Sequence, residues 1–423
     1  MRTTRVMKVM KPRNSWLLSV LALGALLMTW SDRSTAEDHP HATPAPAQQT
    51  TAANIKEYKV ATPYSFPYGI AVDSKGKVWF TEQAGNRVGF LDPLTEKIEE
   101  MLIPSAKGID ERAKGDKSFS VSDIGSPTAI TVAPDDSIWF VQRYGNVISR
   151  LDPVTREFQT FAIPTPQSAP HGIVVAKDGA VWFTERNGNK IGHLDPVTKK
   201  IREFPVPSKN GQPAGIALDA AGNVWFAESE GNAIGKLEPA TGKFTEYPLL
   251  TAFANPSEVA VDDKGNVWFT LLNTNSLGML RANTTIFDQA TIPTFASVPM
   301  GIVLDQKGRV WFTQTRGNKI ALFDPTIPLF KEFAIPTTNS LPTSIALDAA
   351  GNVWFTENDR DANKIGMLPA SEIAAALAPP TSAANATKDK PAPTTFTMVL
   401  AIGGMILFGV FVVVLSRRGK SAK

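Results

Sequence analysis

The stretch AKDGAVWFTERNGNKIGHLDP, at residues 176–196, decides the fold of this 423-residue chain. Its centre, VWFTE at 181–185, recurs with small changes along the sequence. A tryptophan stands second in each of seven copies, as Trp79, Trp139, Trp182, Trp225, Trp268, Trp311 and Trp354. The first interval between these tryptophans is 60 residues and every later interval is 43. A period of about 40 to 50 residues is typical of solenoids and propellers.

Each copy contains four short runs of β-branched and aromatic residues. Around Trp182 they occupy 172–175, 181–185, 190–194 and 201–206, and Asp-Gly, Gly-Asn and Asp-Pro turn signals separate them. Seven such units predict an all-β fold, a seven-bladed β-propeller with four antiparallel strands in each blade. The second run is apolar on both faces, so the tryptophans are predicted to fill the seams between neighbouring blades.

The ends of the repeat region predict how the ring closes. The last copy stops after its third run, at 364–368, and no fourth run follows. A lone fourth run, IKEYKV at 55–60, precedes the first copy and matches FKEFAI at 330–335. The N-terminal strand is therefore expected to complete the seventh blade.

Both ends of the chain predict attachment to a membrane. Residues 1–36 join a basic start, an apolar run and small residues at 34–36, the order of a secretory signal peptide. An uncleaved anchor is the alternative. Residues 396–415 carry no charge and, at about 1.5 Å per residue, would cross a bilayer core of about 30 Å as a transmembrane helix. The basic tail, 416–423, is expected to stay in the cytoplasm.

The remaining segments complete the predicted layout. A Pro/Ala/Thr-rich linker at 37–54 leads into the propeller at 55–372, and an Ala/Pro/Thr-rich stalk follows at 373–395. The prediction is a single-pass membrane protein with its propeller outside the cytoplasm, either periplasmic or at the cell surface. The chain has no cysteine, so this propeller would be stable without disulfides.

The charge distribution argues against nucleic acid as a partner. The formal charge is +3, but ten of the 43 basic residues lie in the leader and the tail. The segment between is net acidic, which does not build the cationic surface that phosphate backbones need. A monomer that binds a small molecule or an extracytoplasmic protein is expected instead.

One asparagine stands before the third run of every copy. A residue that every blade repeats is predicted to meet a turn requirement, because asparagine tolerates the left-handed backbone region. These residues are Asn86, Asn146, Asn189, Asn232, Asn275, Asn318 and Asn363.

Positions that vary between copies are the candidates for function. The loops that enter the first run and those that leave the second run are expected on one face, around the central channel. Their mixed charges and aromatic rings suit a polar ligand, although the acids and arginines could instead pair across a wet rim. The candidate ligand-binding residues are Tyr68, Arg143, Tyr144, His171, Glu185, Arg186, Glu228 and Arg316. The extra residues of the first interval, 105–123, are predicted to form a contact loop on this face.

The phrases PHGI at 170–173, VWFTE at 181–185 and GNKIG at 188–192 resemble the repeats of the streptogramin B (virginiamycin B) lyases. The resemblance spans the repeat region and implies a seven-bladed propeller. It also implies a magnesium-dependent enzyme that opens a cyclic depsipeptide by elimination. Such an enzyme would use a histidine as general base and carboxylates to hold the metal.

The positions to which this resemblance assigns the chemistry hold other residues here. The histidines would follow the loop proline in the sixth and seventh copies, where Met300 and Thr343 stand. The glutamates would precede that proline and follow the second run in the seventh copy, where Leu341 and Asn358 stand. His171 matches the histidine motif, but in the third copy.

Three functions are compatible with these residues. The first is a tethered propeller that binds a ligand or a protein without catalysis. The second is a lyase or lactone hydrolase acting on a cyclic ester, with His171 as base and a divalent metal on nearby glutamates. The third is a stalked structural adaptor. No metal ligands are predicted from the residues themselves, so magnesium follows from the resemblance alone.

Overall fold

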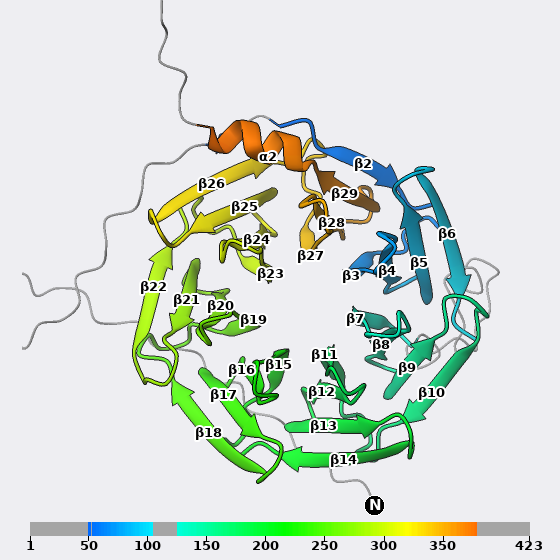
Figure 1. The fold of residues 1–423 in the computed structure, drawn as a ribbon, viewed down its shortest axis with the longest axis vertical. Coiled ribbons are helices and arrows are strands. Elements are labelled where there is room, and N and C mark those ends of the chain that lie inside the picture. Colours follow the sequence, from blue (N-terminus) through cyan, green and yellow to red (C-terminus); the bar gives the residue numbers. More distant parts are fainter. Residues whose placement is uncertain (1–49, 52, 105–124, 379–423) are drawn as a thin grey trace, which may run out of the picture.

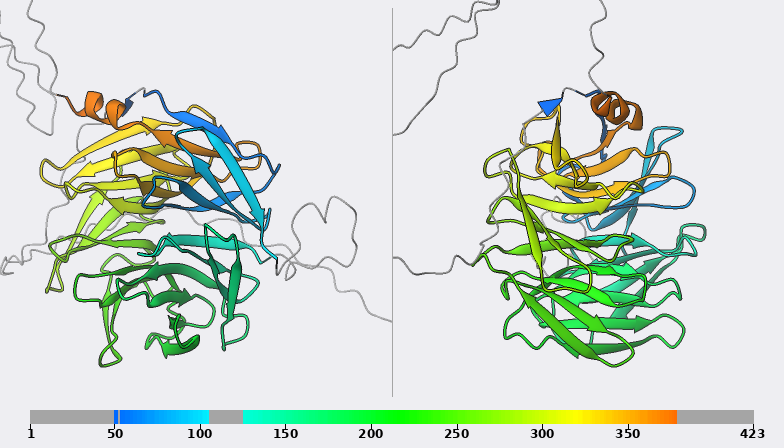
Figure 2. Two further views of the ribbon diagram at one scale, coloured as in Figure 1. Left: turned by 45° about the vertical axis from the view of Figure 1, so that its right-hand side comes forward. Right: turned by 60° about the vertical axis from the view of Figure 1, so that its left-hand side comes forward.

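The computed structural model describes residues 50–51, 53–104 and 125–378. Seven sheets stand radially around a central channel (Figure 1), and the oblique views show the ring as a short cylinder (Figure 2). The seven-bladed β-propeller predicted from the repeat is therefore confirmed. Blades are numbered here in chain order, so that blade 1 begins at Pro67 and blade 7 at Pro342.

Two rows of strands lie nearest the channel. The innermost row is β3 (Pro67–Val72), β7 (Pro127–Val132), β11 (Pro170–Val175), β15 (Pro213–Leu218), β19 (Pro256–Val261), β23 (Pro299–Leu304) and β27 (Pro342–Leu347). The second row contains the tryptophans and is β4 (Val78–Glu82), β8 (Ile138–Gln142), β12 (Val181–Glu185), β16 (Val224–Glu228), β20 (Val267–Leu271), β24 (Val310–Gln314) and β28 (Val353–Glu357).

The two outer rows complete the blades. The third row is β5 (Arg87–Asp92), β9 (Val147–Leu151), β13 (Lys190–Asp195), β17 (Ala233–Glu238), β21 (Ser276–Leu280), β25 (Lys319–Asp324) and β29 (Lys364–Leu368). The outermost row is β6 (Lys97–Leu102), β10 (Phe158–Ala162), β14 (Lys200–Pro205), β18 (Lys243–Pro248), β22 (Phe287–Thr291), β26 (Leu329–Ala334) and β2 (Lys56–Lys59). Neighbouring strands within each blade are antiparallel, as the sequence predicts.

The tryptophans fill the seams between blades. Trp79 of blade 1 packs with Ile138 and Phe140 of blade 2, and Trp354 of blade 7 packs with Phe80 of blade 1. In five blades the indole N–H also donates to an aspartate six residues earlier; these aspartates are Asp73, Asp219, Asp262, Asp305 and Asp348. These five indoles therefore combine a large apolar surface with a satisfied polar group.

The N-terminal strand closes the ring as predicted. Strand β2 pairs antiparallel with β29 and forms the outer edge of blade 7. Glu57 of β2 accepts hydrogen bonds from the backbone N–H and the hydroxyl of Thr337, each at 2.9 Å. Its carboxylate also lies 2.8 Å from Nζ of Lys364. Closure thus depends on polar contacts as well as on backbone pairing.

Two boundaries differ from the prediction. Strand β1 (Thr50–Thr51), expected in the linker, pairs in parallel with β26 and adds a short fifth strand to blade 6. Helix α2 (Ala370–Leu377) extends past the expected start of the stalk, and Figure 1 shows it at the rim of the ring beside β26. The physical reason is apolar burial, since Ile55 and Ile373 join one hydrophobic cluster with Trp311.

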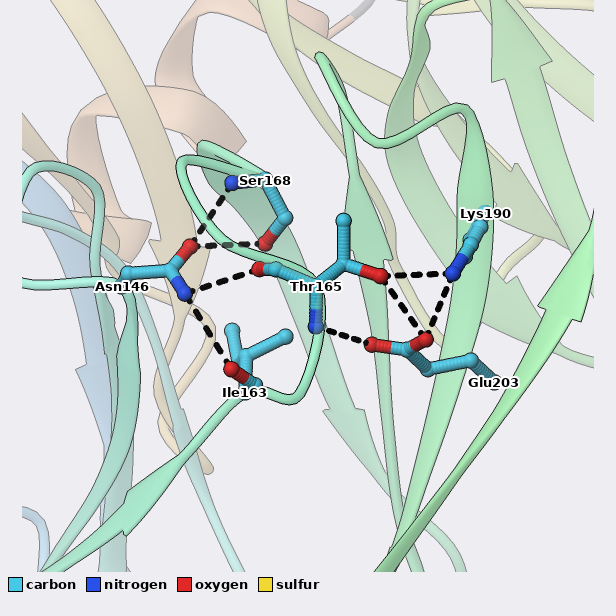
Figure 3. A network of polar contacts seen from close by, with 6 residues as sticks. All are labelled: Asn146, Ile163, Thr165, Ser168, Lys190 and Glu203. Atoms are coloured by element: carbon cyan, nitrogen blue, oxygen red, sulfur yellow. Dashed lines mark hydrogen bonds and ion pairs between the residues drawn. The ribbon is translucent and has the colours of Figure 1, made fainter.

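The repeated asparagines hold the loops that lead into the innermost strands. All seven adopt positive φ values between 46° and 54°, which confirms the predicted turn requirement. In Figure 3, Asn146 binds the connection between blades 2 and 3 by accepting from Ser168 and donating to the Thr165 carbonyl. Glu203 and Lys190 hold Thr165 from the blade 3 side.

Several predicted segments lie outside the described residues: the leader, most of the linker, the 105–123 loop, most of the stalk, the C-terminal apolar segment and the basic tail. Among the described residues, no helix is both long enough and apolar enough to cross a membrane.

Candidate binding site at the channel mouth

The inner strands enclose a cavity of about 200 Å³ at the centre of the ring. Its apolar wall comes from isoleucines of the inner strands, among them Ile70, Ile130, Ile173 and Ile216. The polar groups come from residues one or two positions after the inner-strand proline. The cavity is lined by Tyr68, His171, Glu258, Met300, Thr343 and Ser344, together with the neighbouring backbone.

His171 is the imidazole that faces this cavity. Its side chain is only 7% exposed, and Nδ1 has no hydrogen-bond partner among the described residues. Burial lowers the pKa of His171 to about 3, and the positive charges of Arg186 and Arg143 act in the same direction. At neutral pH the side chain is therefore an uncharged imidazole with an unused ring nitrogen.

Arg143 and Arg186 flank His171 from the turns after β8 and β12. Nε of Arg143 is buried without a hydrogen-bond partner, whereas Nε of Arg186 donates to Oε1 of Gln212 at 3.3 Å. Burial lowers the pKa of Arg186, and the charge of Arg143 lowers it further. The Arg186 guanidinium nevertheless stays charged, as arginine does in proteins. Neither arginine forms an ion pair with a carboxylate in the described part of the chain.

Tyr68 and Glu258 face the same cavity from blades 1 and 5. Burial raises the pKa of Tyr68 to about 12, and the charge of Glu258 adds to the shift while the two arginines oppose it. Burial also raises the pKa of Glu258 to about 7, so this carboxyl is about half ionised at neutral pH. The phenol stays neutral.

Glu258 is the site residue that the sequence reading missed. It stands where four other blades have glycine: Gly69, Gly172, Gly215 and Gly301. Its carboxylate folds over blade 4, where a Cβ on Gly215 would lie 2.6 Å from Oε2 of Glu258. A charged residue at a position otherwise occupied by small residues is a signal that a comparison of the seven copies could have found.

The other predicted residues lie elsewhere. Tyr144 is 51% exposed beside Arg143, with the guanidinium carbon 5.9 Å from the ring centre, and Arg316 is exposed on a turn of blade 6. Glu185 and Glu228 are fully buried and do not line the cavity. Both were predicted as ligand-binding residues, with pairing on a wet rim as the alternative. Their complete burial rules out the wet rim. The structure thus gathers Tyr68, Arg143, His171 and Arg186, but not the remaining four.

Burial shifts the acids inside the blades toward their neutral form. Burial raises the pKa of Glu185 to about 7 and that of Glu228 to about 7. Glu357 occupies the same position in blade 7, where burial and the charge of Glu57 raise its pKa to about 8. These carboxyls belong to the packing of the blades.

Two of the four positions that the resemblance assigns to catalysis line the cavity. Met300 and Thr343 line the cavity. Leu341 has a φ of 51°, and Asn358 donates to the Pro67 carbonyl at 2.9 Å. None of the four offers an imidazole or a carboxylate. They lie on the side of the channel formed by β23 and β27, across from β11, which carries His171 (Figure 1).

The described residues do not fit a magnesium ion. Within the described ranges, no three histidine, aspartate or glutamate side chains gather closely enough to hold a metal. Magnesium prefers several oxygen ligands in octahedral geometry. The channel offers one carboxyl, Glu258, and two guanidinium charges that oppose a cation.

The fold and this site define a class of protein: a seven-bladed propeller with a small polar cavity where the channel opens. The sequence model of the virginiamycin B lyase family matches residues 116–386, and the chain belongs to that family. This confirms the resemblance seen in the repeats.

Solved structures agree with the family assignment. The chain is 30% identical to a streptogramin B lyase, covering 74% of this chain and 96% of that one with a TM-score of 0.66. It is 29% identical to a catalytically inactive histidine-to-alanine variant of virginiamycin B lyase from Staphylococcus aureus with quinupristin, covering 74% and 98% with a TM-score of 0.66.

A curated relative matches over a short segment. Virginiamycin B lyase of Bacillus licheniformis is 57% identical over 37 residues, which is 9% of this chain and 12% of the relative. The matched segment therefore spans a small part of that enzyme's length.

Proposed function

We propose that this protein is a binding module built on the virginiamycin B lyase fold, and that it takes its ligand at the mouth of the channel without catalysis. One observation carries the proposal. The ionisable side chains that line the cavity, Tyr68, His171 and Glu258, come from blades 1, 3 and 5. The four positions assigned to the family's chemistry instead hold Met300, Leu341, Thr343 and Asn358. A site with buried, unpartnered polar atoms and no family base is suited to binding.

Turnover of cyclic esters tests this proposal. Elimination would open a streptogramin B ring without changing its mass, whereas hydrolysis would add one water. The purified protein is incubated with a streptogramin B and with small lactones, and the products are separated by chromatography and weighed by mass spectrometry. The expected result is intact substrate in every case. Ring opening that depends on a channel residue would overturn the binding-only function.

A second candidate function is a lyase or lactone hydrolase acting on a cyclic ester. Glu258 favours it, because a carboxyl with a pKa of about 7 is suited to proton transfer near neutral pH. His171, expected from the sequence as the base, is poorly suited, since a pKa of about 3 makes it a weak one. If turnover is found, Glu258→Gln should abolish it more completely than His171→Asn.

The proposed location is outside the cytoplasm, on a membrane tether. The basic and apolar leader and the uncharged segment at 396–415 support this, together with the basic tail. An epitope tag inserted in the exposed turn at Leu94 should be digested when intact cells are treated with protease. A tag after Lys423 should survive. The reverse pattern would contradict the proposed orientation.

A further inference from the structure

The geometry points to a carboxylate as the group that this channel binds: a small organic acid with an apolar body, or the acidic end of a larger molecule. The inference rests on the proposed binding function and narrows it to a chemical class. Arg143 and Arg186 would hold the carboxylate. His171 would contact the carboxylate or the atoms next to it. The apolar part of the ligand would lie against the isoleucine wall.

The first argument is the charge around the cavity. The charges of Arg143 and Arg186 act on two residues of the cavity lining, Tyr68 and His171, which are themselves neutral. The carboxyl in the lining is that of Glu258. Glu230 also acts on Arg186, but it is exposed on the rim, where solvent screens it. The mouth therefore carries a net positive charge even when Glu258 is ionised. A monoanion would neutralise it.

The second argument is the set of polar atoms left without partners. Nε of Arg143 and Nδ1 of His171 are both buried, and neither makes a hydrogen bond among the described residues. An unpaired buried donor is costly, and a guanidinium more so than a neutral group. Guanidinium and carboxylate groups match in planar geometry and form strong charge-assisted hydrogen bonds. A bound carboxylate would satisfy both needs at once.

The third argument is how the repeat places these residues. The position after the second strand is occupied by Thr315 in blade 6 and Asn358 in blade 7, which donate to the carbonyl of the next blade's first proline at 2.7 and 2.9 Å. In blades 2 and 3 this position holds Arg143 and Arg186, whose longer side chains do not form that bond within the described residues. Nε of Arg143 is thus left without a hydrogen-bond partner among the described residues, whereas Nε of Arg186 donates to Gln212 at 3.3 Å.

The fourth argument is size. A cavity of about 200 Å³ is smaller than the roughly 300–1,000 Å³ of pockets for drug-sized ligands. Its isoleucines could contact the apolar body of a ligand, which inorganic phosphate lacks. A carboxylate on a compact apolar body fits both the volume and the wall.

The test is calorimetric titration of the purified full-length protein with matched probes. Benzoate is compared with benzamide, which has nearly the same shape and no charge, and with inorganic phosphate. A short peptide with a free C-terminus is compared with its amidated form, to tell a free acid from a chain end. We expect a carboxylate to bind about 10- to 100-fold more tightly than its amide, the range of a charge-assisted hydrogen bond.

Variants assign the binding to the site. Arg143→Gln and Arg186→Gln should each weaken carboxylate binding by about tenfold or more, and Arg143→Lys by less. Arg281→Gln is the matched control, because Arg281 is exposed on blade 5 and pairs with Asp288 at 2.6 Å. Its affinity should equal that of wild type. Thermal melting confirms that each variant is folded.

Four outcomes would overturn the inference. The first two are equal binding of amide and carboxylate, and tighter binding of phosphate than of any carboxylate. The other two are unchanged affinity in folded Arg143→Gln and Arg186→Gln, and absence of binding by every carboxylate up to millimolar concentration. Binding of a neutral ligand in the channel would contradict the carboxylate inference but agree with the proposed binding function. Turnover of a depsipeptide would contradict the binding-only function but leave the carboxylate inference untouched.

Discussion

The seams between the blades and the mouth of the channel are built by opposite rules. Every seam repeats the same apolar contact, an indole from one blade against a phenylalanine from the next, with buried side chains throughout the second strands. The mouth changes at each blade, from Tyr68 through His171 to Met300 and Thr343. Repetition identifies what the fold requires, whereas variation identifies what one protein adds to it.

The same lesson holds inside the blades. In blade 6, the amide of Gln314 donates to Glu332 at 2.9 Å, and Lys319 lies 2.7 Å from the same carboxylate. In blade 7 the equivalent trio is Glu357, Glu57 and Lys364. A glutamate can replace the glutamine only as a neutral acid, which agrees with the raised pKa of Glu357. One position thus tolerates two residues of nearly equal shape.

The largest effect is expected from removing the strands that close the ring. Deleting residues 50–60 removes β1 and β2, together with the buried side chains of Ile55 and Val60. Each buried aliphatic side chain contributes about 1.5–3 kcal/mol, and the exposed edge of β29 would add to the loss. The melting temperature should fall by roughly 10 °C or more. The shortened protein should also bind a hydrophobic dye, because the deletion exposes apolar surface. An unchanged melting temperature would contradict the closure.

A seam tryptophan should give the next largest effect. Trp311→Ala removes an indole that is 1% exposed and donates to Asp305 at 3.1 Å. The free energy of unfolding should fall by about 3–5 kcal/mol, measured by chemical denaturation. Leu94→Ala is the control, because Leu94 is 93% exposed and its removal should change little. Equal effects of the two substitutions would show that the seams do not carry the stability.

The buried glutamate of blade 7 should make stability depend on pH. Its native pKa of about 8 lies above the ordinary 4.5, so the native state favours the protonated acid. The contribution of Glu357 to the free energy of unfolding is therefore complete below about pH 4.5 and is lost as pH rises toward 8. Glu357→Gln should match wild type at pH 4.5 and be more stable at pH 8.5, measured by thermal melting.

The reciprocal variant sharpens that test. Gln314→Glu places an acid beside Glu332 in blade 6, so this variant should lose stability relative to wild type as pH rises. If neither variant changes the pH profile, the buried acids are not held in neutral form.

The smallest change in stability is expected at the channel mouth, where a substitution should stabilise the protein. Arg143→Met removes a guanidinium whose Nε is buried and unpartnered, and keeps the apolar stem. The unliganded protein should become more stable by roughly 0.5–1.5 kcal/mol, because function and stability compete at such sites. Denaturation without ligand measures this. A loss of stability as large as that of Trp311→Ala would place Arg143 with the structural residues.

Much of the fold could be read from the sequence, since the 43-residue period, the turn signals and the lone strand at 55–60 are local patterns. The boundaries of the propeller could not. Strand β1 pairs with β26, and Ile373 of helix α2 is buried in the hydrophobic cluster that contains Ile55 and Trp311. Neither contact corresponds to a local sequence pattern.

The site divides in the same way. Sequence comparison between the copies singled out Tyr68, Arg143, His171 and Arg186, because each breaks the repeat where the loops meet the channel. It also singled out Glu185 and Glu228, which the tertiary structure buries in the blades, and it passed over Glu258, which the structure turns into the cavity.

The sequence alone determined seven blades, their strand order and the strand that closes the ring, because a repeat encodes the same short-range packing seven times. Only the tertiary structure decided which polar side chains share the channel and which are shut away from water. The direction in which a side chain points depends on the strand register and on the neighbouring blade, as Gly215 beneath Glu258 illustrates.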